Sequence, residues 1–358
     1  MRRLPILLTA LVFSITPLCA ADKLRIGVVV PLTDAYKPLA DQVWNGAVAA
    51  QTALGGPDKV ELIFTDDHCD AEGGKAAGQS LAAQNVHAVL GFLCTPALIA
   101  ALPELRAKHI PVLTLGARSM NLSRDARKNG DALFRLGPNS NQELEAIANL
   151  ILPLWRDKNF AIIDDGTLHS RDLAESLRIA AEGEGLKPVF VDTFRPALDN
   201  QFSLINRLKK SGATHVFIGG DRDDVAIIAR DAKVRSFPLT IAGGETLAAA
   251  PGEVAMANGV LMVGLPDSAK LETAKAAVAA ATEDMKIAEG YFLPAYAALE
   301  IIVGSIESSK AHASLAETIL KTPHETVIGP VRFTDSGDLS DNPYRLLVAK
   351  DGIFQDYQ

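Results

Sequence analysis

The feature of this sequence that most limits its fold is a regular alternation of short apolar runs with helical patterns. The runs are rich in Val, Ile and Phe and nearly continuous, which is typical of strands covered on both faces. They lie at Leu24–Val30, Val60–Thr65, His87–Leu93, Pro111–Leu115, Phe160–Ile163, Pro188–Phe194, His215–Ile218 and Pro238–Ala242. The helical patterns between them include Asp41–Leu54, Pro96–Lys108, Gln142–Leu152, Ser170–Glu184 and Phe202–Ser211. This alternation predicts an α/β fold with parallel sheets and right-handed crossovers.

The number of predicted strands is too large for one small sheet, so we expect two doubly wound lobes. A chain of 358 residues is long enough to form them. From the order of the elements, we place the changes of lobe at 135–139, 262–266 and 327–329. The first lobe would then contain residues 22–137 and 265–328, and the second would contain residues 138–264 and 329–358.

The last part of the chain has a different pattern. Two long Ala-rich helices are predicted near Leu271–Ile287 and Tyr291–Ser308. The run Gly329–Thr334 is followed by a turn at Asp335–Asp338 and by a second apolar run at Tyr344–Ala349. This arrangement predicts a hairpin that closes the fold.

The N-terminus has the pattern of a secretory signal peptide. Arg2 and Arg3 precede an apolar run, Leu4–Leu18, which ends in small residues. We therefore expect cleavage after residue 21 and a periplasmic location. The alternative is a lipoprotein acylated at Cys19, although such signals prefer a small residue where Leu18 stands.

Export leaves two cysteines, Cys69 and Cys94. An even pair in an oxidising compartment predicts one disulfide, and two buried free thiols are the alternative. The nearby segment Asp66–Asp70 resembles a metal site in composition. Successive residues of an extended segment point to opposite faces, however, so we expect no metal there. Asp335–Asp341 lacks the spacing of a calcium loop.

Several function classes are disfavoured by composition and motifs. The formal charge of −8 argues against a general nucleic-acid binder. The sequence contains no Walker A loop, no Gly-x-Ser-x-Gly elbow and no His-Glu-x-x-His helix. We therefore expect neither an enzyme nor a cofactor.

Polar residues follow several predicted strands, where ligands bind in open parallel sheets. Thr95 stands at the start of a predicted helix. The free backbone N–H groups there could bind a carboxylate, or Thr95 could simply cap its own helix. Gly116 follows the next strand and would let a ligand approach the backbone closely. Arg118 could pair with a carboxylate or be solvated.

The second lobe offers mainly acids at its strand ends. His169 and Ser170 lie at a helix start, and Asp221 and Glu245 each follow a glycine pair. Each acid could accept hydrogen bonds from an ammonium group, or be a loop acid or a helix cap. Anion donors on one lobe and acids on the other predict a zwitterionic ligand such as an amino acid.

A set of segments across the chain has a recognisable combination. They are Leu24–Val29, Asp41-Gln42, Asn45–Ala47, Asp66–Asp70, Gly91–Cys94, Tyr296–Leu299, Gly329–Phe333 and Gly337-Asp338. In these segments the sequence resembles the periplasmic solute-binding proteins of the Leu/Ile/Val-binding family, which have the type I fold. The resemblance implies two lobes joined by three crossovers, a ligand held between them, and the family's disulfide at the segments of Cys69 and Cys94.

The resemblance also suggests roles for individual residues. Thr95 and the backbone of Gly116 and Ala117 match positions that hold the ligand carboxylate, and Glu245 matches the acid that binds its ammonium group. Tyr291 matches an aromatic residue near the late helix.

Other family positions differ here. Arg118 replaces a threonine, Leu39 and Asp221 each replace a tyrosine, and His169-Ser170 replaces a Tyr-Gly pair. The predicted side-chain pocket has thus lost aromatic residues and gained charge.

The function implied by the resemblance is the extracytoplasmic substrate-binding component of an ABC importer. The expected ligand is an amino acid, of the branched-chain type or more polar. The alternatives are an aromatic acid or small amide, and a sensory module that passes its signal to a receptor. The expected partners are a membrane permease and an ATPase, without nucleic acid, and we expect a monomer.

Overall fold

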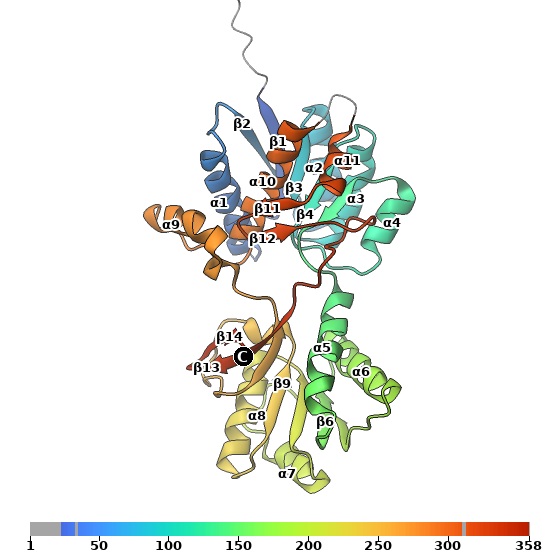
Figure 1. Ribbon diagram of the computed structural model, residues 1–358, viewed down its shortest axis with the longest axis vertical. Coiled ribbons are helices and arrows are strands. Elements are labelled where there is room, and N and C mark those ends of the chain that lie inside the picture. Colours follow the sequence, from blue (N-terminus) through green and yellow to red (C-terminus); the bar gives the residue numbers. More distant parts are fainter. Residues whose placement is uncertain (1–22, 33–34, 310–312, 358) are drawn as a thin grey trace, which may run out of the picture.

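The computed structural model describes residues 23–32, 35–309 and 313–357. The predicted signal peptide, with Cys19, lies outside these residues. The described chain forms two α/β lobes joined by three crossovers (Figure 1). The prediction of two doubly wound lobes is confirmed.

The first lobe is built on a five-stranded parallel sheet with the order β2-β1-β3-β4-β5. Its strands are β1 (Leu24–Val30), β2 (Val60–Asp66), β3 (Ala88–Gly91), β4 (Val112–Thr114) and β5 (Leu133–Arg135). Its helices from the N-terminal part are α1 (Lys37–Ala53), α2 (Ala71–Ala83), α3 (Thr95–Arg106) and α4 (Leu122–Asn129). Along β1, Val28 packs in one core and Val29 in another, so the sheet is covered on both faces.

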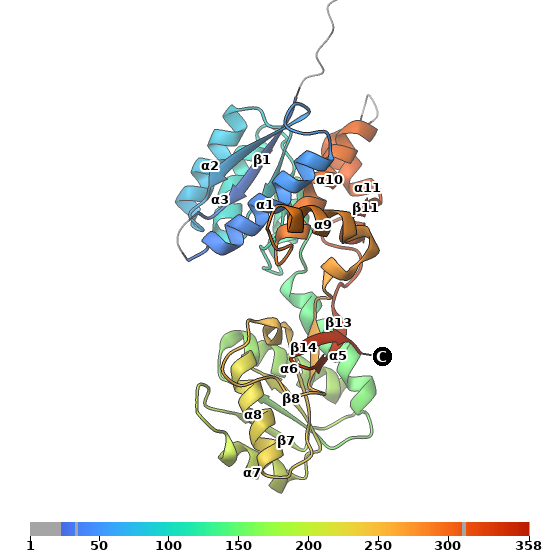
Figure 2. The same cartoon turned by 90° about the vertical axis from the view of Figure 1, so that its left-hand side faces the viewer.

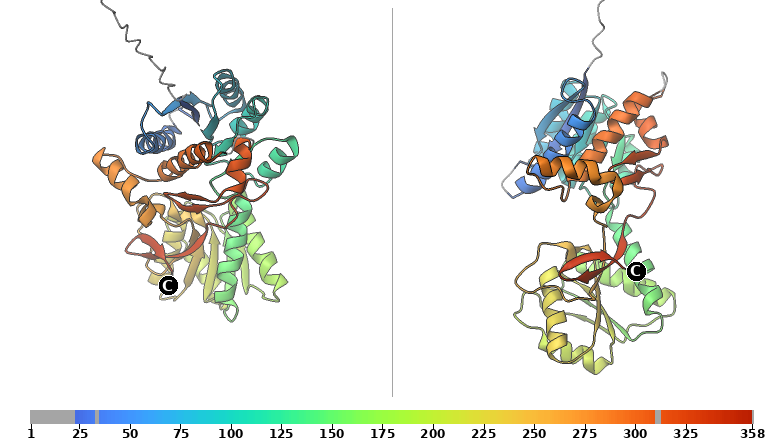
Figure 3. Two further views of the ribbon diagram at one scale, coloured as in Figure 1. Left: turned by 45° about the horizontal axis from the view of Figure 1, so that its top comes forward. Right: turned by 60° about the vertical axis from the view of Figure 1, so that its left-hand side comes forward.

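The late part of the chain returns to this lobe, as the orange helices in Figure 3 show. It contributes the 3₁₀ turns η2 (Ser268–Lys270) and η3 (Glu272–Ala274), the helices α9 (Lys275–Glu283), α10 (Phe292–Ser308) and α11 (Leu315–Lys321), and the strands β11 (His324–Thr326) and β12 (Gly329–Val331). Helix α10 is buried along most of its length and packs against α1. At Gly46 of α1 an added Cβ would lie only 2.0 Å from the Phe292 carbonyl oxygen, so the two helices require glycine there.

The second lobe is built on a seven-stranded sheet with the order β14-β13-β10-β9-β8-β6-β7. Its strands are β6 (Phe160–Asp164), β7 (Phe190–Thr193), β8 (His215–Gly219), β9 (Thr240–Gly243), β10 (Leu261–Gly264), β13 (Arg345–Lys350) and β14 (Ile353–Asp356). Its helices are α5 (Ser140–Trp155), α6 (Leu168–Gly183), α7 (Phe202–Ser211) and α8 (Arg222–Val234), with the 3₁₀ turn η1 (Glu245–Ala248). Helices α5 and α6 cover one face of the sheet, and α7 and α8 cover the other (Figure 2). The sheet is parallel except for β13 and β14, which are antiparallel at one edge.

Local sequence explains why several helices begin and end where they do. Asp70 caps α2 by accepting a hydrogen bond from the Gly73 amide, and Asn139 forms a capping box with Gln142 at the start of α5. Helix α7 ends at Gly212, which adopts the left-handed conformation with φ of 77°.

The predicted closing hairpin is wrong. Strand β12 pairs with β11 in the first lobe, whereas β13 pairs with β10 and β14 in the second. The turn at Asp335–Asp338 exists, but it brings Phe333 next to Leu339. Phe333 packs in the core of the first lobe against Phe134, at 5.2 Å between ring centroids. Burial of this ring keeps the segment after residue 329 with the first lobe, so the predicted change of lobe at 328/329 disagrees with the packing.

The predicted long helix Leu271–Ile287 is also wrong in extent. The segment forms one 3₁₀ turn, η3, and then α9, which has nine residues. Its core contact is the narrow stripe Ala274, Ala277 and Ala281. The Thr273 hydroxyl donates to the Val327 carbonyl, which fixes the first turns in place.

Candidate ligand-binding site

The predicted site residues follow strands of both sheets at the junction of the lobes. Thr95 follows β3, Gly116–Arg118 follows β4, and Glu245 follows β9. Arg118 lies at the junction itself, because its carbonyl accepts hydrogen bonds from the Ser140 amide and hydroxyl at the start of α5.

The structure corrects the predicted capping role of Thr95. Helix α3 begins at Thr95, and the N-cap is Cys94, whose backbone is extended with φ of −113° and ψ of 125°. Cys94 is joined to Cys69 by a disulfide, which confirms the predicted pairing. Because Thr95 is inside the helix, its side chain does not cap the helix. The first turn of α3 therefore keeps backbone N–H groups without capping from a side chain.

The loop after β4 is closely packed against Tyr291, the residue before α10. A Cβ added at Gly116 would lie 3.0 Å from both the Tyr291 hydroxyl oxygen and the Leu93 Cα. A larger residue here would force these neighbours to move, so glycine allows the close approach. Burial raises the pKa of the Tyr291 phenol, so it is a neutral hydroxyl at physiological pH. Tyr291 thus reaches the backbone at Gly116, and the buried Ala117 follows in the same loop.

A charged network joins the two lobes. The Arg118 Nη1 atom lies 2.5 Å from Glu245 Oε1 and 3.0 Å from the Tyr344 hydroxyl. The Tyr344 hydroxyl donates to Glu245 Oε2 at 2.6 Å. Burial is the largest single influence and lowers the pKa of the Arg118 guanidinium, but the charge and hydrogen bond of Glu245, together with Tyr344 and Tyr291, outweigh it, so the net pKa lies above the ordinary value. Arg118 is therefore always charged here.

A second acid, Glu143 of α5, supports this network. It is 2 % exposed, and its Oε1 accepts a hydrogen bond from the Glu245 amide at 2.9 Å. Its Oε2 lies 3.6 Å from His169 Nε2. Burial raises the pKa of Glu143, and the negative charge of Glu245 raises it further.

The predicted residues Ser170, Asp221 and Leu39 lie outside this network. Ser170 is buried and accepts a hydrogen bond from the Thr167 hydroxyl. Asp221 is exposed at the start of α8 and lies near Asp224, whose pKa is raised mainly by burial. Leu39 lies half-buried in the first turn of α1, and its role stays a prediction.

Glu143 and Tyr344 are the site residues that the sequence did not indicate. Glu143 lies in the first turn of a helix, where acids are common for capping reasons alone. Tyr344 precedes β13, where a tyrosine is an ordinary strand residue. Neither residue stood out from the sequence because the contacts with Glu245 depend on how distant segments meet.

Arg135, which is 1 % exposed, fixes the loop that carries Arg118 by hydrogen bonds to its backbone. Its Nη1 donates to the Ala117 carbonyl at 3.1 Å, and its Nη2 donates to the Ser119 carbonyl at 2.7 Å. Its Nε lies 2.9 Å from Asp338 Oδ1 in the segment leading to the third crossover. The position of Arg118 is thus tied to the position of that segment.

The acids of the segment Asp66–Asp70 accept hydrogen bonds from nearby backbone amides. Asp66 accepts from the Leu32 and His68 amides, and Asp67 accepts from the Cys69 amide. Among the described residues, no group of three His, Cys, Asp or Glu is placed to hold a metal ion. None of the helices in the described part of the chain is long and apolar enough to cross a bilayer.

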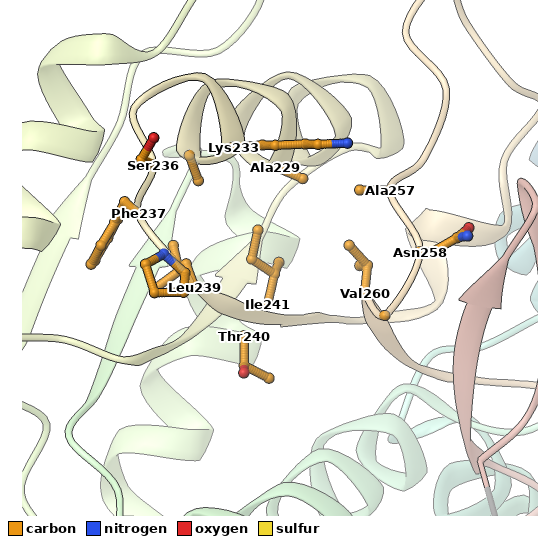
Figure 4. A pocket seen from close by; sticks show the side chains of 13 residues that line it. Ala229, Lys233, Ser236, Phe237, Leu239, Thr240, Ile241, Ala257, Asn258 and Val260 are labelled. Carbon is orange, nitrogen blue, oxygen red and sulfur yellow. The ribbon is translucent and has the colours of Figure 1, made fainter.

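A pocket of about 590 Å³ lies elsewhere in the second lobe, between the end of α8, the start of β9 and the loop before β10 (Figure 4). Its lining is mostly apolar, with Lys233 and Asn258 at its sides. It contains none of the predicted site residues. The candidate site itself is distributed over both lobes.

The fold and this junction define a type I periplasmic binding protein, in which two α/β lobes hold a ligand between them. The sequence profile of the periplasmic binding protein family matches residues 23–352, so the chain belongs to this family. Its members are binding proteins.

Relatives with known names or structures support this assignment. The chain is 29% identical over 344 residues to "Leu/Ile/Val-binding protein homolog 3" of Brucella melitensis, covering 92% of each protein. It superposes with a TM-score of 0.77 on a putative branched-chain amino acid ABC transporter protein from Rhodospirillum rubrum, at 18% identity, covering 94% of this chain and 100% of the other. A solute-binding protein of R. palustris in complex with 4-hydroxybenzoate superposes with a TM-score of 0.68 at 17% identity, covering 94% of this chain and 96% of the other.

Proposed function

We propose that this protein is the periplasmic substrate-binding component of an ABC importer and that it captures a small carboxylate-bearing solute between its lobes. The expected solute classes are amino acids and related acids, because the Brucella relative is named for Leu, Ile and Val and the R. palustris protein is in complex with 4-hydroxybenzoate. The proposed partners are a membrane permease and an ATPase, and the protein acts as a monomer.

The contact between Arg118 and Glu245 is the observation that carries this proposal. Arg118 follows a strand of the first sheet, and Glu245 follows a strand of the second. Thr95 and the Gly116 backbone supply donors for the carboxylate on the first lobe. Glu245 and His169 face the ligand from the second lobe. Binding closes the lobes about the three crossovers, as in other hinge-bending proteins.

Ligand identification and a matched pair of variants test the proposal. The purified protein is denatured, and any released metabolite is identified by mass spectrometry. Small-angle scattering then compares the refolded, emptied protein with and without that metabolite or, if none is released, with a panel of amino acids and carboxylic acids. We expect a smaller radius of gyration with ligand.

The variant T95V should weaken binding about tenfold, because one hydrogen bond to a charged group is lost. The control T52V changes an exposed threonine of α1 and should bind as the wild type does. Scattering curves that stay unchanged with the identified metabolite and with every panel compound would refute the proposal.

A further inference from the structure

We infer that the ligand of this site carries a carboxylate but no ammonium group, because Arg118 of the protein itself occupies the cation position at Glu245. This inference rests on the proposed function and narrows its ligand class. It separates this chain from a receptor for α-amino acids.

Both carboxylate oxygens of Glu245 already have donors within the protein. Arg118 Nη1 is 2.5 Å from Oε1, and the Tyr344 hydroxyl is 2.6 Å from Oε2. The side chains of Arg118 and Glu245 are 33% and 26% exposed, so this ion pair is shielded from much of the solvent. An incoming ammonium group would have to displace a charged guanidinium from a half-buried carboxylate, which is unfavourable.

Glu143 does not offer a second free acceptor for an ammonium group. Its side chain is almost fully buried, one oxygen accepts the Glu245 amide, and the other faces His169 at 3.6 Å. Both acids of the second-lobe side are therefore already paired, Glu245 with Arg118 reaching across from the first lobe and Glu143 with the Glu245 amide. An ammonium group finds no uncompensated carboxylate in this set.

The first-lobe side of the site is different. It presents the start of α3 at Thr95, the backbone after Gly116 and the Tyr291 hydroxyl. None of these groups is an acid, and all of them can donate to an anion. A carboxylate therefore matches the first lobe, whereas Glu245 and Glu143, the acids of the network on the second lobe, already have partners within the protein. The ligand class is an amine-free carboxylic acid.

Matched ligand pairs test this inference directly. Isothermal titration measures the binding of L-leucine against 4-methylpentanoate, and of L-phenylalanine against 3-phenylpropanoate. Each pair differs by the α-amino group alone. The wild type should bind at least one of the amine-free acids at least about tenfold more tightly than its amino-acid partner.

The variant R118T should abolish this preference, because it frees Glu245 for an ammonium group. We expect the amino-acid partner to gain about tenfold or more in affinity. R124T is the matched control, since Arg124 is an exposed arginine of α4 that pairs with Asp125. If R118T does not fold, E245Q replaces it. E245Q removes the internal counter-ion of Arg118 and should tighten binding of the amine-free acid about threefold or more.

Two results would overturn the inference. The first is wild-type protein that binds either amino acid as tightly as its amine-free partner. The second is an E245Q variant that loses ligand affinity, since Glu245 would then contact the ligand cation. Failure of the proposed function looks different: no member of either pair would bind to the wild type or to R118T, and scattering would detect no closure.

Discussion

The ion pair between Arg135 and Asp338 allows a quantitative prediction about the first lobe. Arg135 is 1% exposed and Asp338 is 19% exposed, and the two side chains are 2.9 Å apart. Ser123 donates to the same carboxylate at 2.7 Å. Replacing Asp338 with alanine leaves a buried guanidinium without its counter-ion.

The expected loss of stability follows from that burial. Removing one partner of a buried ion pair costs about 3–5 kcal/mol. Asp338 keeps some contact with water, so we expect the lower end, about 3 kcal/mol, for D338A. D338N retains an acceptor oxygen for Arg135 and Ser123 but removes the charge, and we expect a smaller loss of about 1–2 kcal/mol. The prediction therefore includes an order of stability, in which D338A is the least stable, D338N is intermediate and the wild type is the most stable.

Urea unfolding measures these differences, and the two tryptophans separate the lobes. Trp44 lies on α1 in the first lobe, and Trp155 lies at the end of α5 in the second. In a W155F background, Trp44 fluorescence follows the first lobe alone. D41A is the control, because Asp41 forms an exposed pair with Lys37 and its loss should change little.

The same variant should loosen the loop that carries Arg118. Arg135 holds the carbonyl groups of Ala117 and Ser119, so hydrogen exchange of residues 116–120 should be faster in D338A than in wild type. If the unfolding free energy of the first lobe in D338A is within about 0.5 kcal/mol of the wild-type value, which is about the error of the extrapolation, the reasoning from burial is refuted.

Three further predictions concern other parts of the molecule. The double variant C69S/C94S should lose about 3.5 kcal/mol of stability by the loop-entropy relation for a sequence separation of 25, and urea unfolding with and without reductant measures this. G46A should destabilise the first lobe by about 2 kcal/mol or more, because the added methyl group clashes with α10. G304A, at an exposed helical position with open space around it, should stabilise the same lobe by about 0.5–1 kcal/mol. Equal melting temperatures for the two variants would contradict this prediction. Burial raises the pKa of Glu143 in the folded state, so the protonated side chain adds to the stability of the fold at low pH, and this contribution is lost as the pH rises through that pKa. The neutral side chain of E143Q avoids this loss. The variant should therefore gain more stability over wild type at pH 7.5 than at pH 4.5, as urea unfolding at the two pH values would measure.

The alternation of apolar runs and helical patterns determined the fold class by itself. Strands β1, β2, β6 and β8 lie within about a residue of their predicted ranges, because each is a mainly apolar segment with few polar interruptions. The pairing of Cys69 and Cys94 also followed from the sequence, since the predicted signal peptide would remove Cys19 and leave two cysteines. These features depend on short-range pattern and on counting.

The course of the last segment was decided by tertiary packing. Gly329–Thr334 and Tyr344–Ala349 look like two arms of a hairpin in sequence. Burial of Phe333 against Phe134 places the first segment with one sheet, and pairing with β10 places the second with the other. Local pattern cannot distinguish these outcomes, because both arms have strand-like composition.

The chemistry of the site was likewise divided between sequence and structure. The sequence placed Thr95, Gly116 and Glu245 after strands, which is where ligands bind in parallel sheets. Only the tertiary structure brought Arg118 to Glu245, 127 positions apart, and added Tyr344 and Glu143 around them. The strength of an ion pair depends on distance and on exclusion of water, and both are set by how the lobes meet.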